Sequence, residues 1–502
     1  MEYLVTAEEM KRYDQTAIHT FGIPALVLME RAALSAAEEI LWFMKQHPKK
    51  DGSAYRLLIG AGMGNNGADG LALARILSRK AQVEVVCIGQ REHATAQWEQ
   101  QYEILKNYPV QTGSNPVADE YDIVVDALFG VGLSREITGS YREWIERLNG
   151  LKGWKVALDV PSGIHSDHGR VMGCAFRADL TVCFAFRKRG LLFYPGCLYA
   201  GNTLVKEIGI DEQTFGDGVP QMFRLTEEPE EVLPVRVPDG NKGSFGKVLM
   251  VAGSNNMAGA ALLCGESCLR TGAGMVKLVS PGENRVIIQT ALLEALYTDV
   301  LDQASLSWAD VLVIGPGIGQ SQEAKERLVT LLQAHQPLVV DADGLNLISG
   351  ELKLQDLLRK RAQKEAPVIL TPHVGELSRL IGKTIAEIKE YPVRAAQEAA
   401  EAFGCIVVSK DARTLICQQN RQICMNAAGD HGMATAGSGD VLAGIIAGLL
   451  AQGMEGFQAA CVGAYLHGKA GEEAARRFGS YSMKAGDLIT ALKSMKGRKE
   501  NS

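Results

Sequence analysis

Short apolar runs alternate with amphipathic stretches along most of the chain. In the first half, runs rich in valine, isoleucine and leucine lie at 57–59, 83–88, 123–125, 156–158 and 180–184. In the second half they lie at 248–252, 275–279, 311–314, 338–340, 368–370 and 406–408. Runs without polar alternation, separated by helix-period segments, are typical of parallel strands covered on both faces. The pattern therefore predicts an α/β fold with two three-layer domains.

The stretch between residues 209 and 241 separates the two series of strands. It contains four prolines, an acidic cluster at 227–231 and no long periodic element. At 502 residues, the chain is long enough for two large domains. We expect these domains at residues 1–220 and 225–498.

The composition argues against nucleic-acid-binding, membrane-spanning and secreted proteins. The chain is 46% hydrophobic and 22% charged, with a net charge of −6, so it offers no basic excess for nucleic-acid phosphates. It lacks an apolar run of the roughly 18 residues that span a bilayer, and its start does not resemble a secretory signal. Thr6 and Glu9 instead have the spacing of a helix capping box. Ten scattered cysteines predict reduced, mostly buried thiols in a cytoplasmic protein.

A glycine-rich turn at 60–70 follows the first long apolar run. Its glycines match G-x-G-x-x-G between a strand and a helix, which is the context of a phosphate cradle. The next predicted strand ends near Cys87–Gly89 without the acidic residue of a dinucleotide fingerprint, which disfavours a redox Rossmann domain. The turn also carries three polar side chains, Asn65, Asn66 and Asp69. They either hydrogen-bond to the backbone of their own turn or offer oxygen ligands to a bound group.

Further oxygen-bearing side chains follow other strands of the first half. Asp126, Asp159 and Ser162 come directly after apolar runs. Ligands of open parallel sheets bind beyond the carboxyl ends of the strands. Together with Asn66, these residues suit a hard cation, either monovalent or Mg²⁺, although each aspartate alone could cap a helix.

The second half contains a glycine-rich loop at 432–444 that runs into an apolar helix. Free N–H groups and the helix dipole make such a loop an anion-binding site, and no Walker lysine follows it. Asp440 lies at the helix start. It is either an N-cap or a catalytic base that takes a proton from a hydroxyl attacking a phosphoryl group.

Polar residues also follow the other strands of the second half. They lie in Gly315–Gly319, at Asp341, Asp343 and Asn346, in Thr371–Glu376 and in Lys410–Thr414. We favour ligand contact over a structural role for His373. Glu376 and the Asp341/Asp343 pair either position Mg²⁺ through waters or cap helices.

Residues 1–220 resemble the NAD(P)H-hydrate epimerase family. The matching motifs are Met29–Ala32, Asn65–Gly70, Asp126–Leu133, Asp159–Gly163 and the Lys188-x-Gly190 turn. The resemblance implies interconversion of the R and S forms of hydrated NADH and NADPH, with Asp159 as the acid/base. It implies potassium at Asn66, Asp126 and Ser162. It also implies that the substrate is lined by Asn65, Asn66, Gly67, Ala68, Asp69, Gly130, Val131, Gly132, Leu133, Ser134, Arg135, Glu136 and Asp159.

Residues 242–494 resemble the ADP-dependent NAD(P)H-hydrate dehydratase family, which has a ribokinase-like fold. The matching motifs include Lys242–Gly246, Arg270–Gly274, Gly315–Gly319, Thr371–Glu376 and His467-Gly468. The resemblance implies substrate contacts at Ala260, Gly317, His373 and Asp440. It implies ADP or AMP contacts at Lys410, Asp411, Ala412, Arg413, Thr414 and Gly439, where Asp411 replaces the glycine usual in relatives.

The two resemblances together imply a relay. The first domain, Rossmann-like, converts the R epimer to S; the second phosphorylates the ring hydroxyl from ADP, and loss of phosphate restores the dihydronicotinamide. We expect potassium, Mg²⁺ and ADP as cofactors, the two hydrates as substrates, no nucleic-acid or membrane partner, and a homo-oligomer. Two alternatives stay open: a ribokinase-like vitamin or sugar kinase, which would need ATP and leave a stable phosphorylated product, and a ligand-sensing scaffold without turnover.

Overall fold

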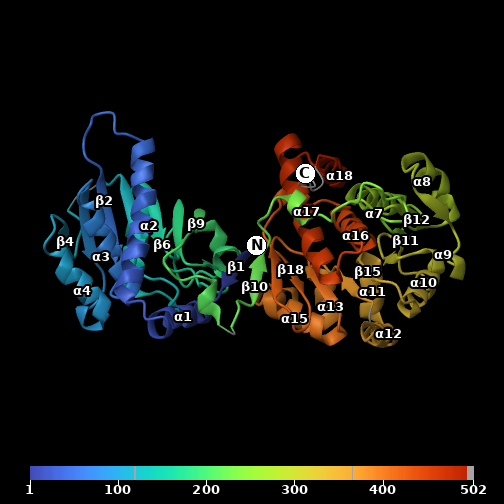
Figure 1. Ribbon diagram of the computed structural model, residues 1–502, viewed down its shortest axis with the longest axis horizontal. Helices are drawn as coiled ribbons and strands as arrows, with labels where there is room; N and C mark the ends of the chain where they lie inside the picture. Colours follow the sequence, from blue (N-terminus) through green and yellow to red (C-terminus); the bar gives the residue numbers. More distant parts are fainter. Residues whose placement is uncertain (118–119, 217, 365, 495–502) are drawn as a thin grey trace. The chain divides into compact units, whose positions relative to one another are not determined.

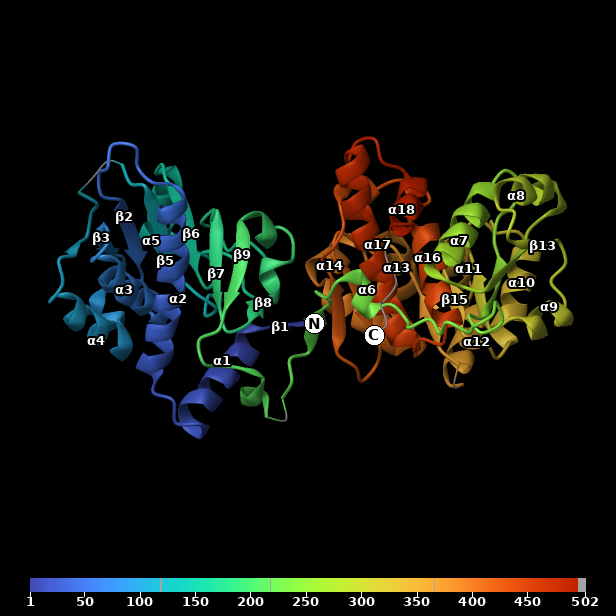
Figure 2. The ribbon, with the colours of Figure 1, turned by 45° about the horizontal axis from the view of Figure 1, so that its top comes forward.

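The computed structural model describes residues 1–117, 120–216, 218–364 and 366–494. Residues 118–119 and 217 of the expected first domain, and 365 and 495–498 of the expected second, lie outside the described residues. The chain divides into two compact units, Tyr3–Met222 and Phe223–Ser502, and Met1–Glu2 groups with the second. Figures 1 and 2 show a layer of strands with helices packed against it in each unit.

The first unit is built on a seven-stranded sheet of order β4-β3-β2-β5-β6-β7-β9, in which every neighbouring pair is parallel. The strand order reverses between β2 and β5, which is where ligands bind in doubly wound sheets. This order confirms the predicted Rossmann-like α/β class. The strands are β2 (Arg56–Ala61), β3 (Gln82–Cys87), β4 (Gln111–Gly113), β5 (Ile123–Ala127), β6 (Trp154–Leu158), β7 (Leu180–Phe184) and β9 (Asn202–Lys206), beside a short parallel pair of β1 (Glu2–Val5) and β8 (Arg187–Lys188).

Alternate residues of β2 enter two different cores. Leu57 and Ile59 pack in the core that contains α2 (Ala25–Gln46) and α3 (Asn65–Leu77). Leu58 packs in the core on the other face, under α5 (Gly139–Gly150). Burial on both faces explains why these strands read as unbroken apolar runs. The remaining helices are α4 (Ala96–Leu105) and α1 (Ala7–Gln15), and the capping box predicted at Thr6 and Glu9 starts α1 as expected.

The second unit contains a sheet in the order β13-β12-β11-β14-β15-β16-β17-β18-β19. It is parallel from β13 to β17 and antiparallel from β17 to β19. The antiparallel hairpin at its end is not predicted by the sequence pattern. The strands are β11 (Lys247–Val251), β12 (Met275–Val279), β13 (Leu296–Thr298), β14 (Val311–Ile314), β15 (Leu338–Val340), β16 (Val368–Leu370), β17 (Ile406–Ser409), β18 (Thr414–Cys417) and β19 (Ile423–Asn426).

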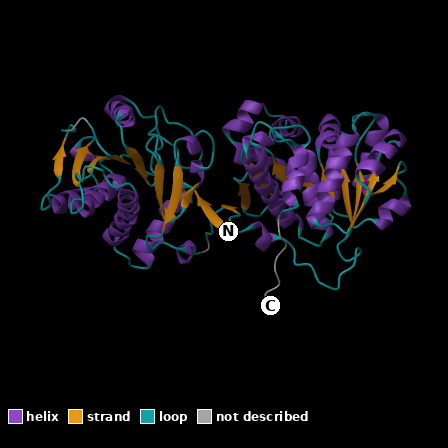
Figure 3. Cartoon of the chain, turned by 90° about the horizontal axis from the view of Figure 1, so that it is seen from above, coloured by secondary structure: helices purple, strands orange, loops and turns teal. Residues whose placement is uncertain are grey.

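Two groups of helices pack among themselves and form the outer layers of the second unit, with the strands between them (Figure 3). One group is α7 (Ala258–Thr271), α16 (Ser438–Ala451), α17 (Gly456–Phe478) and α18 (Ala485–Leu492). The other is α10 (Gln322–Gln333), α11 (Ala342–Gly350), α12 (Leu352–Ala362), α13 (Val374–Ile381), α14 (Ile385–Glu390) and α15 (Pro392–Phe403). The short elements are β10 (Met222–Arg224), α6 (Pro229–Val232), α8 (Arg285–Ala291) and α9 (Gln303–Trp308).

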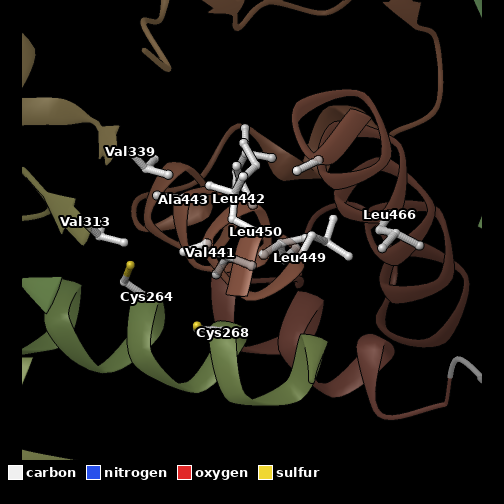
Figure 4. Close-up of a cluster of buried hydrophobic side chains, with 14 of the residues drawn as sticks. Cys264, Cys268, Val313, Val339, Val441, Leu442, Ala443, Leu449, Leu450 and Leu466 are labelled. Carbon is white, nitrogen blue, oxygen red and sulfur yellow. The ribbon is translucent and has the colours of Figure 1, made fainter. Parts of the chain in front are cut away.

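Helix α16 forms the centre of the largest core. Figure 4 shows Val441 and Leu442 of α16 among Cys264 and Cys268 of α7 and strand residues such as Val313. The helices approach closely because α16 carries a glycine at 444, where a Cβ would lie 2.2 Å from the Cys264 carbonyl oxygen. This packing fixes the N-terminal end of α16, where Asp440 lies.

None of the ten cysteines, all of which lie in the described residues, forms a disulfide, and seven are buried, as expected. Among the described residues, no helix is long and apolar enough to cross a membrane.

Candidate active sites

The glycine-rich turn of the first unit joins β2 to α3. A Cβ at Gly62 would lie 2.2 Å from the Leu128 carbonyl oxygen, and one at Gly67 would lie 1.8 Å from the Gly62 carbonyl oxygen. Neither position has room for a side chain, so the backbone approaches itself closely here. Gly64 is the N-cap of α3 and supplies no side chain to the first N–H groups of the helix. The turn therefore has the form of the predicted phosphate cradle.

Asp126 and Ser162 meet in the interior beyond the centre of the sheet. Asp126 is fully buried near the end of β5, and its carboxylate accepts hydrogen bonds from the Ser162 hydroxyl at 2.6 Å and the Ser162 N–H at 2.7 Å. The Ser162 hydroxyl oxygen also accepts from the Phe129 N–H at 2.9 Å. Burial raises the pKa of Asp126 to about 6, although its hydrogen bonds with Ser162 oppose this.

Asn66 lies beside the same loop with an unsatisfied amide. Both its amide nitrogen and its amide oxygen are buried and lack a hydrogen-bond partner. A Cβ built on Gly130, the residue after Phe129, would lie 3.5 Å from Asn66 Cγ. A buried polar group without a partner is costly, and each such group in a native site calls for an explanation, such as a bound ion or ligand.

Asp159 follows β6 in a left-handed conformation, with a φ of 66°. Its Oδ1 accepts from the Phe184 N–H at 3.1 Å and forms an ion pair with Lys188, which is only 1% exposed. Lys188 also donates to the Phe184 carbonyl at 2.8 Å. The other carboxylate oxygen faces Gly130, where a Cβ would lie 3.6 Å from it. One oxygen of Asp159 is therefore fixed and the other is presented to the loop at 129–130.

A cleft of about 1470 Å³ is lined by Asn66, Asp159 and Lys188. Among the predicted substrate residues, its lining includes Asn65, Asn66, Asp69, Gly130, Val131, Gly132, Leu133, Arg135 and Asp159. Gly67 and Ala68 are instead buried within α3, and Ser134 and Glu136 are exposed outside the lining. Sequence reasoning gave no role to most of the other lining residues, among them Asp14 of α1 and Lys188, the partner of Asp159.

Carboxyl groups in this cleft differ in their electrostatic environments. Burial, followed by the charges of Asp159 and Asp14, raises the pKa of Asp69 well above its ordinary value. Burial also raises the pKa of Asp14. Asp159 has a buried lysine as its partner, and Asp69 does not. The cleft thus contains one carboxyl group whose pKa burial raises, Asp69, and another, Asp159, that is paired with a buried cation.

In the second unit, the helix that carries Asp440 begins without a side-chain cap. Its N-cap is Gly437, with a φ of 88°, and Asp440 is the third helical residue. The N-cap interpretation of Asp440 is therefore wrong. Burial and the nearby carboxylate of Asp341 raise the pKa of Asp440 to about 7, against the opposing effect of Lys410.

Lys410 comes directly after β17, and its side chain lies beside the start of α16. Its ammonium group donates to Asp341 at 2.7 Å, and Asp341 also accepts from the Thr371 hydroxyl at 2.6 Å. A Cβ on Gly439 would lie 3.1 Å from the Lys410 nitrogen. Burial lowers the pKa of Lys410, but Asp341 and Glu376 raise it, and the net shift is upward. Lys410 therefore remains a cation beside the uncapped helix start.

Residues 371–376 lead into helix α13, and the imidazole of His373 among them is also exposed. His373 caps α13, its Nδ1 accepting from the Gly375 N–H at 2.9 Å, and Glu376 accepts from the His373 N–H at 2.8 Å. The imidazole is nevertheless 55% exposed. Burial and then the charge of Lys410 lower the pKa of His373, and burial raises the pKa of Glu376 to about 7.

The remaining predicted residues of the second unit come from several elements, including Ala260 in α7 and Gly317 in the loop after β14. Gly317, with a φ of 62°, touches Ala260, since a Cβ there would lie 2.8 Å from the Ala260 side chain. The Gly319 N–H donates to Asp343 at 2.9 Å. Asp411 accepts from the Ala412 N–H at 2.8 Å and does not adopt positive φ, so this turn needs no glycine.

His467 is a further residue that sequence reasoning left without a role. Its Nε2 lies 2.9 Å from the Ser438 carbonyl oxygen and 3.2 Å from the Ser438 hydroxyl. Burial lowers the pKa of His467 to about 4, although the Ser438 bond opposes this. It therefore holds the start of α16 as a neutral group.

Among the described residues, no three or more histidine, cysteine, aspartate or glutamate side chains are arranged to hold a metal ion. Asn66, Asp126 and Ser162 form a different kind of donor set, made of one amide, one carboxylate and one hydroxyl group.

Both halves of the chain match known families. Residues 25–190 match the family described as the YjeF-related protein N-terminus, and residues 248–494 match the family described as NAD(P)H-hydrate dehydratase. A ribokinase-like protein from Enterococcus faecalis has 29% identity and a TM-score of 0.48, covering 55% of this chain and 95% of its own. The ADP/ATP-dependent NAD(P)H-hydrate dehydratase from Bacillus subtilis has 29% identity and a TM-score of 0.47, covering 53% of this chain and 93% of its own.

Full-length relatives share one description. Bifunctional NAD(P)H-hydrate repair enzymes match from Moorella thermoacetica (37% identity, 98% of this chain and 96% of that protein) and from Escherichia coli (32%, 97% and 92%). A third, from Thermofilum pendens, has 34% identity over 96% of this chain and 94% of its own. The chain therefore belongs to the family of bifunctional NAD(P)H-hydrate repair enzymes, in which an epimerase domain precedes a dehydratase domain.

Proposed function

We propose that residues 1–220 interconvert the R and S forms of hydrated NADH and NADPH, and that residues 225–498 dehydrate the S form at the expense of ADP, giving AMP and phosphate. The observation that carries the second activity most directly is Asp440, which lies beside Lys410 at an uncapped helix start. In the first unit, the corresponding observation is Asp159, held by Lys188 at the edge of a large cleft.

In the epimerase site, Asp159 is the proposed proton acceptor. Its Oδ1 is occupied by Lys188 and the Phe184 N–H, so the oxygen toward Gly130 is left for the hydroxylated ring carbon. Asp69, whose pKa is raised by burial, lines the same cleft and is the proposed proton donor. Inversion at a hydroxylated carbon needs both an acceptor and a donor of protons, and two carboxyl groups in different environments provide them.

A potassium ion fits the donor set at Asn66, Asp126 and Ser162. The Asn66 amide oxygen is buried without a partner, and Asp126 and Ser162 add a carboxylate and a hydroxyl oxygen. These groups bring one negative charge, which suits a monovalent ion better than a dehydrated divalent one. Bound there, the ion would supply positive charge at the 129–130 loop. Asn66 and Ser162 would hold it through neutral oxygens.

In the dehydratase site, Asp440 is the proposed base for the ring hydroxyl. Lys410 and the free N–H groups at the start of α16 face the same place and would hold the phosphates of ADP. Asp341 and Asp343 already bind Lys410 and the Gly319 N–H, so we propose that Mg²⁺ reaches this site through waters and neutralises phosphate charge. His373, Ala260 and Gly317 are the proposed contacts to the nicotinamide nucleotide, and Lys410–Thr414 with Gly439 those to the adenine nucleotide.

The test of this function is the fate of chemically hydrated NADH. With ADP, the protein should restore the absorbance of the dihydronicotinamide and release AMP and phosphate in equal amounts. A vitamin or sugar kinase would instead consume ATP and accumulate a stable phosphorylated product, which would refute the proposal. Whether ATP replaces ADP is measured in the same assay. The cytoplasmic location and the homo-oligomeric state stay predictions.

A further inference from the structure

The cleft of the first unit extends well beyond the reacting groups. Asp159 and Asn66 lie beyond β6 and at the start of α3, but the lining continues past the end of β3 to Gln90, His93 and Thr95. At about 1470 Å³ the cleft exceeds the roughly 300–1,000 Å³ of an ordinary small-molecule pocket. A dinucleotide substrate therefore has room for both of its halves in this unit.

The start of α3 lies between the two ends of the cleft. This helix has 13 residues, and Gly64 caps it without a side chain, so its first N–H groups are available to an anion. The loop after β3 is tied to this turn by a hydrogen bond of 3.0 Å from the Thr95 N–H to the Met63 carbonyl. A pyrophosphate at the helix start would thus have the reacting groups on one side and the β3 loop on the other.

Aromatic side chains line the end of the cleft near β3. Tyr141 and Trp144 of α5 contribute to the lining there. The Tyr141 ring lies 4.9 Å from that of Phe129, which precedes Gly130 and so links this end of the cleft to the reacting groups. Tyr141 reaches the loop after β3, since a Cβ on Gly89 would lie 2.3 Å from the Tyr141 hydroxyl oxygen. Flat apolar side chains in a cleft are what a nucleobase stacks on.

Charge also distinguishes this end of the cleft. Among the described residues that line it from Cys87 to Gln97, with Ser114, Tyr141 and Trp144, none is acidic. In dinucleotide-binding sheets an acidic residue after the second strand binds the ribose hydroxyls and repels a 2′-phosphate. Here the exposed side chains of Gln90 and His93 occupy that region. Nothing in this lining repels a phosphate on the ribose.

We propose that the aromatic end of the cleft is the subsite for the adenosine half of the substrate, with Trp144 stacking on the base and His93 facing the ribose 2′ position. This assignment rests on the proposed epimerase function. It explains how one cleft accepts both hydrated NADH and hydrated NADPH: the reacting end does not contact the 2′ position, and the lining of the adenosine end has no acidic side chain against a phosphate there.

The experiment measures epimerisation of hydrated NADH and hydrated NADPH by chromatography, without ADP, so that the second unit is silent. His93→Asp should lower kcat/KM for hydrated NADPH by about tenfold or more and leave hydrated NADH within about threefold, because the new carboxylate faces only the 2′-phosphate. His335→Asp, the same change at an exposed histidine of the other unit, should alter neither substrate.

Trp144→Ala should raise KM for both substrates roughly fivefold to a hundredfold with kcat retained, because stacking on the base is lost while the reacting groups Asp159 and Asp69 are unchanged. Trp144→Phe should recover most of the binding. Trp42→Ala is the matched control, because Trp42 is 60% exposed on α2 and outside the cleft. Adenosine 2′,5′-bisphosphate should compete with hydrated NADPH, and more weakly in the His93→Asp variant.

Equal effects of His93→Asp on both substrates, or no effect on either, would overturn the inference. So would a loss of kcat at unchanged KM in a folded Trp144→Ala protein, because that result would place the reacting ring at the aromatic end. If the unaltered protein epimerises neither hydrate, the proposed function itself fails.

Discussion

Single side chains in this protein acquire their chemistry from what surrounds them. Asp440 and Asp302 are both aspartates at helix starts in the second unit. Asp302 is an exposed N-cap whose carboxylate accepts from the Ser305 N–H at 2.7 Å, and its pKa is lowered. Asp440 is not a cap, and burial with Asp341 raises its pKa to about 7. The same residue type therefore serves stability in one place and is suited to proton transfer in the other.

Replacing Asp440 with asparagine tests this contrast. Asp440→Asn should slow ADP-dependent dehydration by about two to four orders of magnitude, the usual range for loss of a general base. Binding of the substrate should persist, and epimerisation should be unaffected. Asp302→Asn is the matched control and should change turnover little, because asparagine caps about as well as aspartate. Near-normal recovery of NADH by the Asp440 variant would mean that another residue is the base.

The pH dependence of dehydration should report the same group. A base acts when ionised, so kcat/KM should be level above a pKa of about 7 and fall about tenfold per pH unit below it. Glu376 also has a pKa of about 7, so it must be separated from Asp440. The acidic limb should survive in Glu376→Gln, where glutamine can still complete the capping box, and should vanish from the residual rate of Asp440→Asn. The opposite result would assign the limb to Glu376.

Potassium dependence tests the unsatisfied amide of Asn66. Epimerisation should be faster in potassium than in lithium at equal ionic strength, and Asn66→Ala should remove this difference while dehydration continues. Asn107→Ala, at the exposed end of α4, should keep the full difference. Equal rates of epimerisation in both salts for the unaltered protein would show that the reaction does not depend on a potassium ion.

The sequence indicated some of these residues and not others. Asp159 directly follows an apolar strand and Asp440 starts an apolar helix, so a local pattern marks both. Lys188 belongs to a strand of two residues, and Asp14 lies within an amphipathic helix. The proximity of Lys188 to Asp159, and of Asp14 to Asp69, depends on how separate segments pack, which no local signal encodes. The residue assignments taken from the family motifs remain predictions at the level of single contacts.

At the scale of elements, burial decides what can be predicted. All eleven apolar runs form strands, because central parallel strands are covered on both faces. β4 was missed because its residues are exposed and polar. β18 and β19 are buried but form an antiparallel hairpin, so the expectation of a wholly parallel series did not include them.

The turn before α3 should be intolerant of a single added methyl group. Gly67→Ala would bring a Cβ to 1.8 Å from the Gly62 carbonyl oxygen, and backbone has to move to relieve this contact. We expect the free energy of unfolding of the first unit to fall by at least about 1–3 kcal/mol, with loss of epimerisation. Gly150→Ala, where a Cβ meets nothing within 4 Å, is the control for thermal melting. An active, fully stable Gly67→Ala protein would show that the turn is looser than described.

At the scale of the whole molecule, the chain consists of two compact units, each with its own sheet and its own site. The first unit extends to residue 222, because Gly218 and Gln221 form hydrogen bonds with side chains of α1. Met1 and Glu2 group with the second unit, where they form ion pairs with Glu227 and Arg224. Such surface pairs contribute about 0–1 kcal/mol, so their loss should not unfold either part.

Separate expression of residues 1–222 and 223–502 should therefore give two soluble proteins, the first an epimerase and the second a dehydratase. Thermal unfolding of each should resemble one of the transitions of the full chain. Aggregation or inactivity of the second piece, with an active full chain, would show that the second unit does not fold independently.

The most direct measurement follows an equal mixture of R- and S-hydrated NADH with excess ADP. The unaltered protein should convert all of it to NADH, while Asp159→Asn should stop after the S half and leave the R epimer. Adding the separate first unit should then restore complete recovery. If the Asp159 variant still consumes both epimers, or if the unaltered protein leaves the R form untouched, the division of labour between two sites is contradicted.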